Sequence, residues 1–340
     1  MRWVFTMTDR PDRSGAQARL LEGRQDLLLS RRHAIAALAA QGVMAAVPWR
    51  ARGATRTIRV GYQKYGTLIL LKARGFLEEA LRPAGIGVEW AQFPAGPPLL
   101  QALVAGALDF GQTGDLPPVF VQAASPDALV YAGHEARCGA SEAIIVPTAS
   151  TIRTVVDLKG RRVAVTRGAD AHWLLIASLR KHGLSLADVT VSYLLPAAAR
   201  PAFETGQIDA WAIWDPYLSG ANANTRTIAT GDDVDGGTAF YLARRGFWAE
   251  SPDLVRAVLA AVAKCDDWAA SNRDEVVALL AHSTGLAPDV VARSLAKLRY
   301  GLLPMTPDVI AGQQRIAEGF HAAGLLPAVP DVAAAAPHIM

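Results

Sequence analysis

Gly106-Ala107-Leu108-Asp109 and Gly206-Gln207-Ile208-Asp209 share one pattern and lie 100 residues apart in the chain. Each follows a stretch with helical periodicity, and each leads through an apolar run to a further acid, Asp115 or Asp215. Glycine readily adopts the left-handed backbone angles that end a helix. Each unit therefore indicates a helix, a glycine stop, a strand and a polar turn. A repeat of this kind predicts two similar α/β lobes with a cleft between them.

From Thr57 onward, short apolar or β-branched runs alternate with longer helical stretches. This alternation is typical of an α/β protein whose sheets have a parallel core. The expected strands are residues 57–62, 86–92, 109–113, 128–133, 143–147, 162–166, 189–194, 209–213 and 238–243. The expected helices include residues 98–105, 171–182, 254–270, 273–282 and 307–323, and no strand is expected after Pro252.

The composition is that of a globular protein, with 51% hydrophobic and 19% charged residues among 340. The formal net charge of +3 is concentrated in residues 1–54, which hold nine Arg and four acids. The rest of the chain carries 25 Lys and Arg against 27 Asp and Glu. A protein surface with nearly equal numbers of basic and acidic residues does not favour nucleic-acid binding.

Residues 1–54 read as a removable leader. Ser30-Arg31-Arg32-His33 precedes an uncharged apolar run, residues 34–47, and small residues follow it. A positive segment followed by a short apolar run is typical of a signal peptide, and this run falls short of the roughly 20 apolar residues of a membrane span. We expect cleavage between Ala46 and Thr55 and export to the periplasm. The paired arginines resemble a twin-arginine signal, and a Sec signal remains open.

The chain has two cysteines, Cys138 and Cys265, and none before Cys138, so a lipoprotein anchor is not expected. Two cysteines without metal-site spacing indicate buried or free thiols. No G-x-S-x-G, H-E-x-x-H or P-loop motif occurs, and no G-x-G-x-x-G motif lies on a strand-to-helix turn. We therefore expect neither catalysis nor a cofactor nor a bound metal.

Four strand-to-helix turns carry polar or glycine-rich sequence. They are Gln63-Lys64-Tyr65-Gly66-Thr67, Pro94-Ala95-Gly96-Pro97-Pro98, Thr113-Gly114-Asp115-Leu116-Pro117-Pro118 and Arg167-Gly168-Ala169-Asp170-Ala171-His172. Prolines suit the first helical turn, and Asp115 is expected to cap its helix. Helix N-termini offer unpaired N–H donors and a partial positive charge. Several of them at one cleft predict a site for a strong-acid anion; ordinary helix capping is the alternative for any single turn.

Trp214 and Asp215 end the second repeat strand in A-W-A-I-W-D-P-Y, residues 210–217. An indole at the carboxyl end of a strand can cover an aliphatic chain while its N–H donates one hydrogen bond. A core tryptophan is the alternative interpretation.

The turns resemble those of aliphatic-sulfonate-binding proteins of ABC importers, within the group that includes taurine-, nitrate- and thiamine-precursor-binding proteins. The matching segments run in family order over most of the chain after residue 57. They are G-Y-Q-K at 61–64, F-P-A-G-P at 93–97, T-G-D-L-P-P at 113–118, D-L-K-G at 157–160, D-A-W-A-I-W-D-P-Y at 209–217 and F-Y-L-A at 240–243.

This resemblance implies a type II periplasmic binding protein fold, with two Rossmann-like lobes joined by two hinge strands near residues 142–147 and 240–243. Lobe I would comprise residues 55–144 plus 246–340, and lobe II residues 145–245. The implied function is capture of an aliphatic sulfonate for sulfur acquisition and its delivery to a membrane permease. The protein is expected to act as a monomer and to catalyse nothing.

The resemblance also implies a set of ligand-binding residues. Lobe I would supply Gln63, Gly96, Thr113, Gly114 and Asp115, and the second lobe Gly168, Asp170, His172, Trp214 and Asp215, with Glu142 on a hinge strand. Glu142 matches an acidic position that lies near an amino group in taurine binders. One departure concerns Ala169-Asp170-Ala171, because sulfonate binders have a serine-rich turn there.

Other readings stay open. The ligand could be taurine, nitrate, a pyrimidine or another small anion. A different class of protein, the sulfinate desulfinases, shares this architecture and uses a cysteine nucleophile in the cleft. The first-lobe turns of this chain contain no cysteine.

Overall fold

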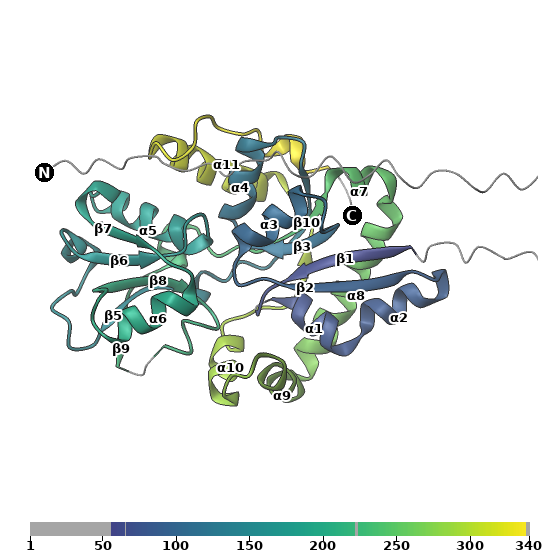
Figure 1. Ribbon diagram of the computed structural model, residues 1–340, viewed down its shortest axis with the longest axis horizontal. Coiled ribbons are helices and arrows are strands. Elements are labelled where there is room, and N and C mark those ends of the chain that lie inside the picture. Colours follow the sequence, from purple (N-terminus) through teal and green to yellow (C-terminus); the bar gives the residue numbers. More distant parts are fainter. Residues whose placement is uncertain (1–55, 65, 222–223, 338–340) are drawn as a thin grey trace, which may run out of the picture. The chain divides into compact units, whose positions relative to one another are not determined.

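The computed structural model describes residues 56–64, 66–221 and 224–337, so the expected leader at residues 1–54 lies outside the described residues. The described chain forms two sheets, each flanked by helices (Figure 1). We call the sheet that contains β1, with its helices, the first lobe, and the sheet that contains β6, with its helices, the second lobe. The expectation of two α/β lobes is confirmed.

The strands are β1 (Thr57–Tyr62), β2 (Gly87–Gln92), β3 (Phe110–Thr113), β4 (Leu129–Glu135), β5 (Glu142–Pro147), β6 (Arg162–Val165), β7 (Thr190–Tyr193), β8 (Ala210–Trp214), β9 (Thr225–Thr230), β10 (Phe240–Arg244) and β11 (Leu302–Leu303). The α-helices are α1 (Thr67–Arg74), α2 (Phe76–Leu81), α3 (Gly96–Val104), α4 (Leu116–Ala124), α5 (Asp170–Lys181), α6 (Pro196–Glu204), α7 (Arg245–Glu250), α8 (Pro252–Ser271), α9 (Arg273–Thr284), α10 (Pro288–Leu295) and α11 (Pro307–Ala322).

The two sheets have equivalent strand orders. The first runs β2-β1-β3-β10-β4-β11 and the second β7-β6-β8-β5-β9. In both, the repeat strand (β3 or β8) has a parallel neighbour on one side and an antiparallel neighbour, β10 or β5, on the other. The internal repeat seen in the sequence is therefore a repeat of sheet topology.

The antiparallel strands are exchanged between the lobes. β5 follows β4 of the first lobe in the chain but belongs to the second sheet, and β10 follows β9 of the second lobe but belongs to the first sheet. The chain thus crosses between the sheets at residues 136–141 and 231–239. We propose these crossings as the lobe boundaries, a few residues before the positions expected from the sequence.

Each half of the repeat is held by an arginine and an aspartate. In the first lobe, Arg59 of β1 donates from Nε to Oδ2 of Asp109 (3.0 Å) and from Nη2 to Oδ1 (2.8 Å), and it also donates to the Gly106 carbonyl. Arg244 of β10 donates to the same carboxylate. These bonds join β1, β10 and the turn before β3.

The second lobe repeats this arrangement. Arg162 of β6 donates from Nε to Oδ2 of Asp209 (3.0 Å), from Nη2 to Oδ1 (2.7 Å) and to the Gly206 carbonyl. Gly106 and Gly206 both have φ of 73°, the left-handed region that favours glycine. The repeated Gly and Asp therefore serve the same purpose in both lobes.

Each lobe has its own hydrophobic core. In the first, side chains alternate across β10: Tyr241 and Ala243 pack with α1, α2 and α8, whereas Phe240 and Leu242 pack with α3 on the other face. The second core packs α5 and α6 on its sheet. A further apolar cluster, which we call the bridging cluster, joins α4, α5 and α11 across the lobes (Leu116, Val119, Trp173, Ile176, Ile316, Ala317, Phe320 and Leu326).

Several elements differ from the sequence prediction. β9 was not expected, because Thr225–Thr230 is mostly polar and lies at an edge of the sheet, where one face stays partly exposed. The expectation that no strand follows Pro252 is wrong, because β11 pairs with β4 at Leu302 and Leu303. A two-residue strand is too short to give a periodic signal. α10 was also missed.

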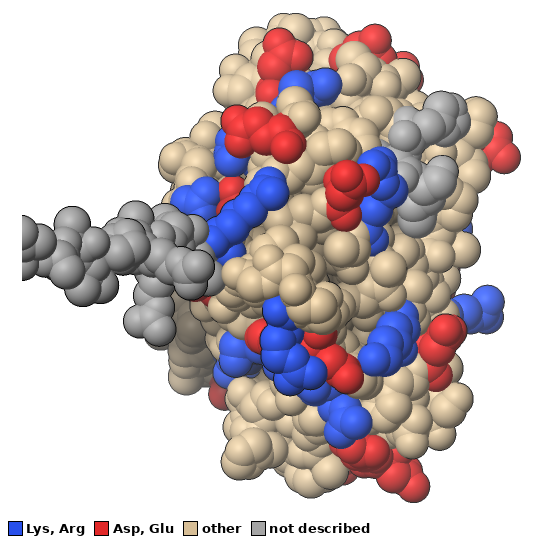
Figure 2. Space-filling model, turned by 90° about the vertical axis from the view of Figure 1, so that its right-hand side faces the viewer, with Lys and Arg blue, Asp and Glu red and all other residues tan. Residues whose placement is uncertain are grey.

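The face of the molecule shown in Figure 2 agrees with the nearly neutral charge balance of the sequence after residue 54. Figure 2 shows one face of the molecule, on which Lys and Arg alternate with Asp and Glu. Among the described residues, no helix has the length and apolar character needed to cross a bilayer.

The internal repeat provides a matched pair for a stability measurement. Asp109→Asn should lower the free energy of unfolding by about 3 kcal/mol, because it leaves two arginines beside a buried amide. Asp209→Asn should cost about 1 kcal/mol or less, because exposed ion pairs contribute little. The side chain of Asp109 is 4% exposed and that of Asp209 28%. Urea denaturation of both variants measures the difference, and equal losses would contradict the expected effect of burial.

Candidate functional site

The N-termini of three helices meet where the lobes face one another. α3 and α4 begin in the first lobe and α5 in the second. A Cβ atom on Gly96, the first residue of α3, would lie 3.2 Å from Cβ of Thr113, and one on Gly168 would lie 3.6 Å from the Phe120 ring. The turns identified in the sequence therefore lie around a shared region between the lobes.

Gly114 of the first lobe and Asp170 of the second lie in direct contact. A Cβ atom on Gly114 would fall 1.9 Å from Oδ2 and 2.0 Å from Cγ of Asp170. The Asp170 carboxylate therefore packs directly on the backbone of the turn before α4, and a side chain at Gly114 would require this carboxylate to move. Gly114 has no positive φ, which means that the need for glycine here comes from space rather than from backbone angles.

The expectation that Asp115 caps α4 is wrong. A capping side chain accepts from the N–H of the second or third helical residue, and these are Pro117 and Pro118, which have none. The Asp115 carboxylate instead accepts a hydrogen bond from the Gly237 N–H at 3.0 Å. The prolines also leave Leu116 as the only residue of the first helical turn before Val119 that has an N–H.

Asp115 is held inside the protein as a carboxyl group that resists ionisation. Its side chain is buried, and Gln313 of α11 donates to its backbone carbonyl. Burial raises its pKa to about 6, although hydrogen bonds from the backbone of Gly237 and Thr238 act in the opposite direction.

Glu142, at the start of β5, is buried next to Asp115 and Asp170. It lies opposite Trp214 in the ladder between β5 and β8. Its Oε1 would lie 2.5 Å from a Cβ atom on Gly231 and 2.6 Å from one on Gly236. Both carboxyl oxygens are buried and have no hydrogen-bond partner among the described residues. Burial raises the pKa of Glu142 well above its ordinary value, and the charges of Asp115 and Asp170 raise it further.

His172 is a buried, neutral donor. Its Nδ1 accepts from the Gly168 N–H at 3.2 Å, which assigns the proton of the neutral ring to Nε2. Burial lowers the pKa of His172 to about 4, and the positive charge of Arg167 contributes to the shift. Within the part of the chain that the structure describes, Nε2 has no hydrogen-bond partner, so this N–H is available to an acceptor.

Trp214 and Asp215 lie at the end of β8 but face different surroundings. Trp214 is buried in the second core and makes an edge contact with Tyr217. The Asp215 carboxylate accepts from the Ser219 N–H at 2.8 Å and from Lys297 Nζ at 2.8 Å. It is thus directed toward the residues after α10, where its charge is paired.

The remaining first-lobe position, Gln63, lies on the turn after β1 and donates to the Gln112 carbonyl at 3.2 Å, next to Thr113. Two site features escaped the sequence reasoning. Gly236-Gly237, on the crossing before β10, contacts Asp115 and Glu142, and an adjacent glycine pair was a usable signal. Trp173 lies beside the same glycines, and its buried indole N–H has no hydrogen-bond partner among the described residues. In the sequence, Trp173 falls at a position of a helical pattern where a core residue is expected.

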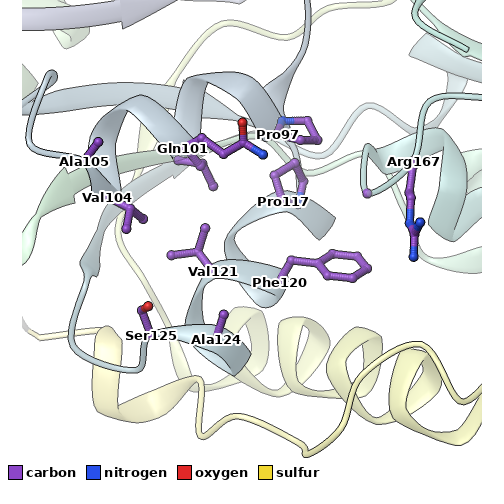
Figure 3. Close-up of a pocket in the computed structure, with 12 residues that line it drawn as sticks. Pro97, Gln101, Val104, Ala105, Pro117, Phe120, Val121, Ala124, Ser125 and Arg167 are labelled. Atoms are coloured by element: carbon purple, nitrogen blue, oxygen red, sulfur yellow. The ribbon is translucent and has the colours of Figure 1, made fainter. Parts of the chain in front are cut away.

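An apolar groove adjoins these turns on the first lobe. It has a volume of about 470 Å³ and lies between α3 and α4, with Arg167 and Gly168 of the second lobe at one end (Figure 3). Val104 and Val121 form part of its walls, and the Phe120 ring lies toward Arg167. Apolar walls beside polar helix starts suit a ligand with a charged head and an aliphatic chain.

A family model described as NMT1/THI5 like matches residues 66–276, well over half of the chain. The chain belongs to the NMT1/THI5-like family. A protein of Escherichia coli (strain K12) to which aliphatic sulfonate binding is attributed is 40% identical over 275 residues, covering 80% of this chain and 85% of the relative. A taurine-binding periplasmic protein of the same organism is 27% identical over 180 residues, which is 52% of this chain and 55% of that protein.

Solved structures of this family have the same fold. The alkanesulfonate-binding protein of Xanthomonas axonopodis pv. citri bound to MOPS matches with a TM-score of 0.78 and 40% identity, covering 82% of this chain and 97% of that one. The periplasmic aliphatic sulphonate binding protein of Escherichia coli matches with a TM-score of 0.76 and 39% identity, covering 84% and 93%. The type II periplasmic binding fold and the resemblance to sulfonate-binding proteins are confirmed.

Enzymes are more distant neighbours. A desulfurization enzyme shares the fold with a TM-score of 0.64 at 17% identity. The two cysteines of this chain are free, Cys138 on the crossing before β5 and Cys265 on α8. Neither lies on the four candidate turns, and the relatives that share 39–40% identity are described as binding proteins.

Gly114→Ala should hinder the approach of the lobes, because its methyl group would overlap the buried end of the Asp170 side chain and force it to shift. We expect a larger radius of gyration in small-angle X-ray scattering and an unchanged far-UV circular dichroism spectrum. The double variant Gly114→Ala/Asp170→Ala removes the overlap and should return to the wild-type radius. A single variant as compact as the wild type would show that the contact does not limit closure.

Proposed function

We propose that this protein is the extracytoplasmic solute-binding component of an ABC importer and that it captures aliphatic sulfonates for sulfur acquisition. The observation that carries the proposal is the proximity of three helix N-termini from two lobes, with the buried His172 on the first turn of one of them. Such donors favour an anion that stays ionised at every physiological pH. The sulfonate-binding relatives support the same ligand class.

The proposed ligand-binding residues are the eleven positions expected from the sequence. Those proposed to face the ligand are Gln63, Gly96, Thr113, Gly114, Asp115, Glu142, Gly168, Asp170, His172 and Trp214. Asp215 would act from behind this region, because its carboxylate is paired with Lys297. The aliphatic part of the ligand would extend toward the groove between α3 and α4.

A second candidate ligand is taurine or another aminoalkanesulfonate. The buried Glu142 carboxyl has two unpartnered acceptor atoms, and an ammonium group would satisfy them. A simple alkanesulfonate has no ammonium group to donate to these oxygens, so the Glu142 carboxyl would have to bind a proton instead. Nitrate has no apolar part that would use the groove, and no amino group for Glu142.

The proposed setting follows from this function. The leader would direct the protein to the periplasm, and the ligand-bound form would deliver its ligand to a membrane permease. Closure of two lobes around the ligand by hinge bending is the motion that this fold supports. We propose that the protein works as a monomer.

Affinity should depend on the length of the alkyl chain. We expect the Kd to fall by about fourfold per methylene along ethane-, butane- and octanesulfonate until the groove is filled, since each buried CH₂ contributes about 0.8 kcal/mol. Isothermal titration calorimetry gives the constants, with taurine, nitrate and sulfate in the same panel. Val121→Asn should flatten the trend.

Val156→Asn is the matched control, because Val156 is exposed and lies outside the groove. It should retain the wild-type trend. Binding of nitrate or sulfate in preference to every sulfonate would contradict the proposed ligand class. A Kd that is independent of chain length would exclude the groove as the site of the alkyl chain.

A further inference from the structure

The carboxylate of Asp170 occupies the space in front of α4. Asp170 is the first residue of α5 in the second lobe, yet its side chain packs on the backbone of Gly114 in the first lobe. The backbone N–H groups of Leu116, the first residue of α4, and of Asp170 itself act to lower the pKa of this carboxyl group, and the Leu116 N–H acts on the Asp115 carboxyl as well. One side chain thus lies at the N-termini of two helices from opposite lobes.

These partners are the ones that a bound anion would require. The first turn of α4 has two prolines, so Leu116 is the only one of its first three residues that can donate an N–H. The first turn of α3 has the same composition, with Gly96 before Pro97 and Pro98. Because these donors are few, a carboxylate that lies at the start of α4 removes a substantial part of what the site offers to an external anion.

The groups around Asp170 are predominantly acidic. Asp115 faces it from the turn before α4, and Glu142 from β5. On its own lobe, Arg167 precedes α5 and His172 is neutral in the first turn of the helix. Arg137 and Asp232 act on Glu142 from the two crossings. Burial and the charge of Asp115 raise the pKa of Asp170 well above its ordinary value.

We infer that Asp170 is a specificity-determining residue that competes with the external sulfonate for the start of α4. When its carboxyl is ionised, it is the anion of the site and repels a second one. When it is protonated, its O–H becomes a donor to the sulfonate. This inference rests on the proposed function, and it predicts an affinity for sulfonates that falls as the pH rises.

The test is the pH dependence of butanesulfonate binding, measured by calorimetry from pH 5 to pH 8. Butanesulfonate stays ionised over this range, so any change belongs to the protein. For the wild type, the Kd should rise toward a limit of about tenfold per pH unit where one proton is linked to binding. Asp170→Asn and Asp170→Ser should bind with a lower Kd than the wild type at pH 8 and with a less steep dependence on pH, although the Asp115 carboxyl, whose pKa is about 6, still titrates in the same region.

Asp253→Asn is the matched control. Asp253 also lies in the first turn of a helix, α8, but its side chain is 94% exposed and contacts Arg256. The substitution makes the same change in charge away from the site, so the wild-type pH profile should be retained. A control with a flattened profile would assign the effect to net charge and overturn the inference.

The other outcomes are distinguishable. Asp170 variants that keep the wild-type affinity and pH profile would show that no competition occurs. Folded variants that bind more weakly than the wild type at every pH would make Asp170 a direct ligand contact; the inference would then fail while the proposed function stands. If neither the wild type nor the variants bind any sulfonate at pH 5, the proposed function fails, and the inference with it.

Discussion

The site depends on one steric constraint, the contact of Asp170 with a backbone that carries no side chain at Gly114. Helix starts from two separate sheets can approach each other only where side chains are small or absent. At this position the Asp170 carboxylate takes the space that a Cβ atom would need. Donors and acceptors of both lobes, including His172 and Glu142, thereby share one desolvated region. Their shifted pKa values follow from this removal from water.

The exchange of strands explains why polar residues of the candidate site lie on or next to the segments that cross between the sheets. β5 and β10 leave the lobe that precedes them and complete the sheet of the other. Glu142 begins β5, and Gly237, just before β10, donates to Asp115. Residues on a crossing are near both lobes whatever the chemistry of the ligand. A change in the angle between the lobes would therefore alter these contacts before any in the cores.

Much of the fold was visible in the sequence because two signals agreed. The pattern of Gly106 to Asp109 and its copy 100 residues later marked equivalent turns, and strand and helix periodicity placed most elements. β9 was not found because its polar alternation resembles that of a loop. β11 depends on pairing with β4, which no local pattern reports.

The candidate site was only partly predictable. Helix starts are local features, so the turns at Gly96, Thr113 and Gly168 could be recognised individually. The roles of the carboxylates could not be predicted, because they depend on which residues of the two lobes come into contact. Asp115 reaches Gly237 rather than its own helix, since the prolines after it have no N–H to offer. Asp215 is neutralised by Lys297, a residue distant in sequence, and Trp173 was hidden in an ordinary helical pattern.

The bridging cluster has a thermal consequence. Leu116, Trp173 and Phe320 join α4, α5 and α11 across the lobes, so separation of the lobes would expose aromatic and aliphatic surface to water. Hydration of apolar surface increases the heat capacity, and hydrophobic association weakens on cooling. The equilibrium between joined and separated lobes therefore depends on temperature. Even without a ligand, cooling shifts it toward separation.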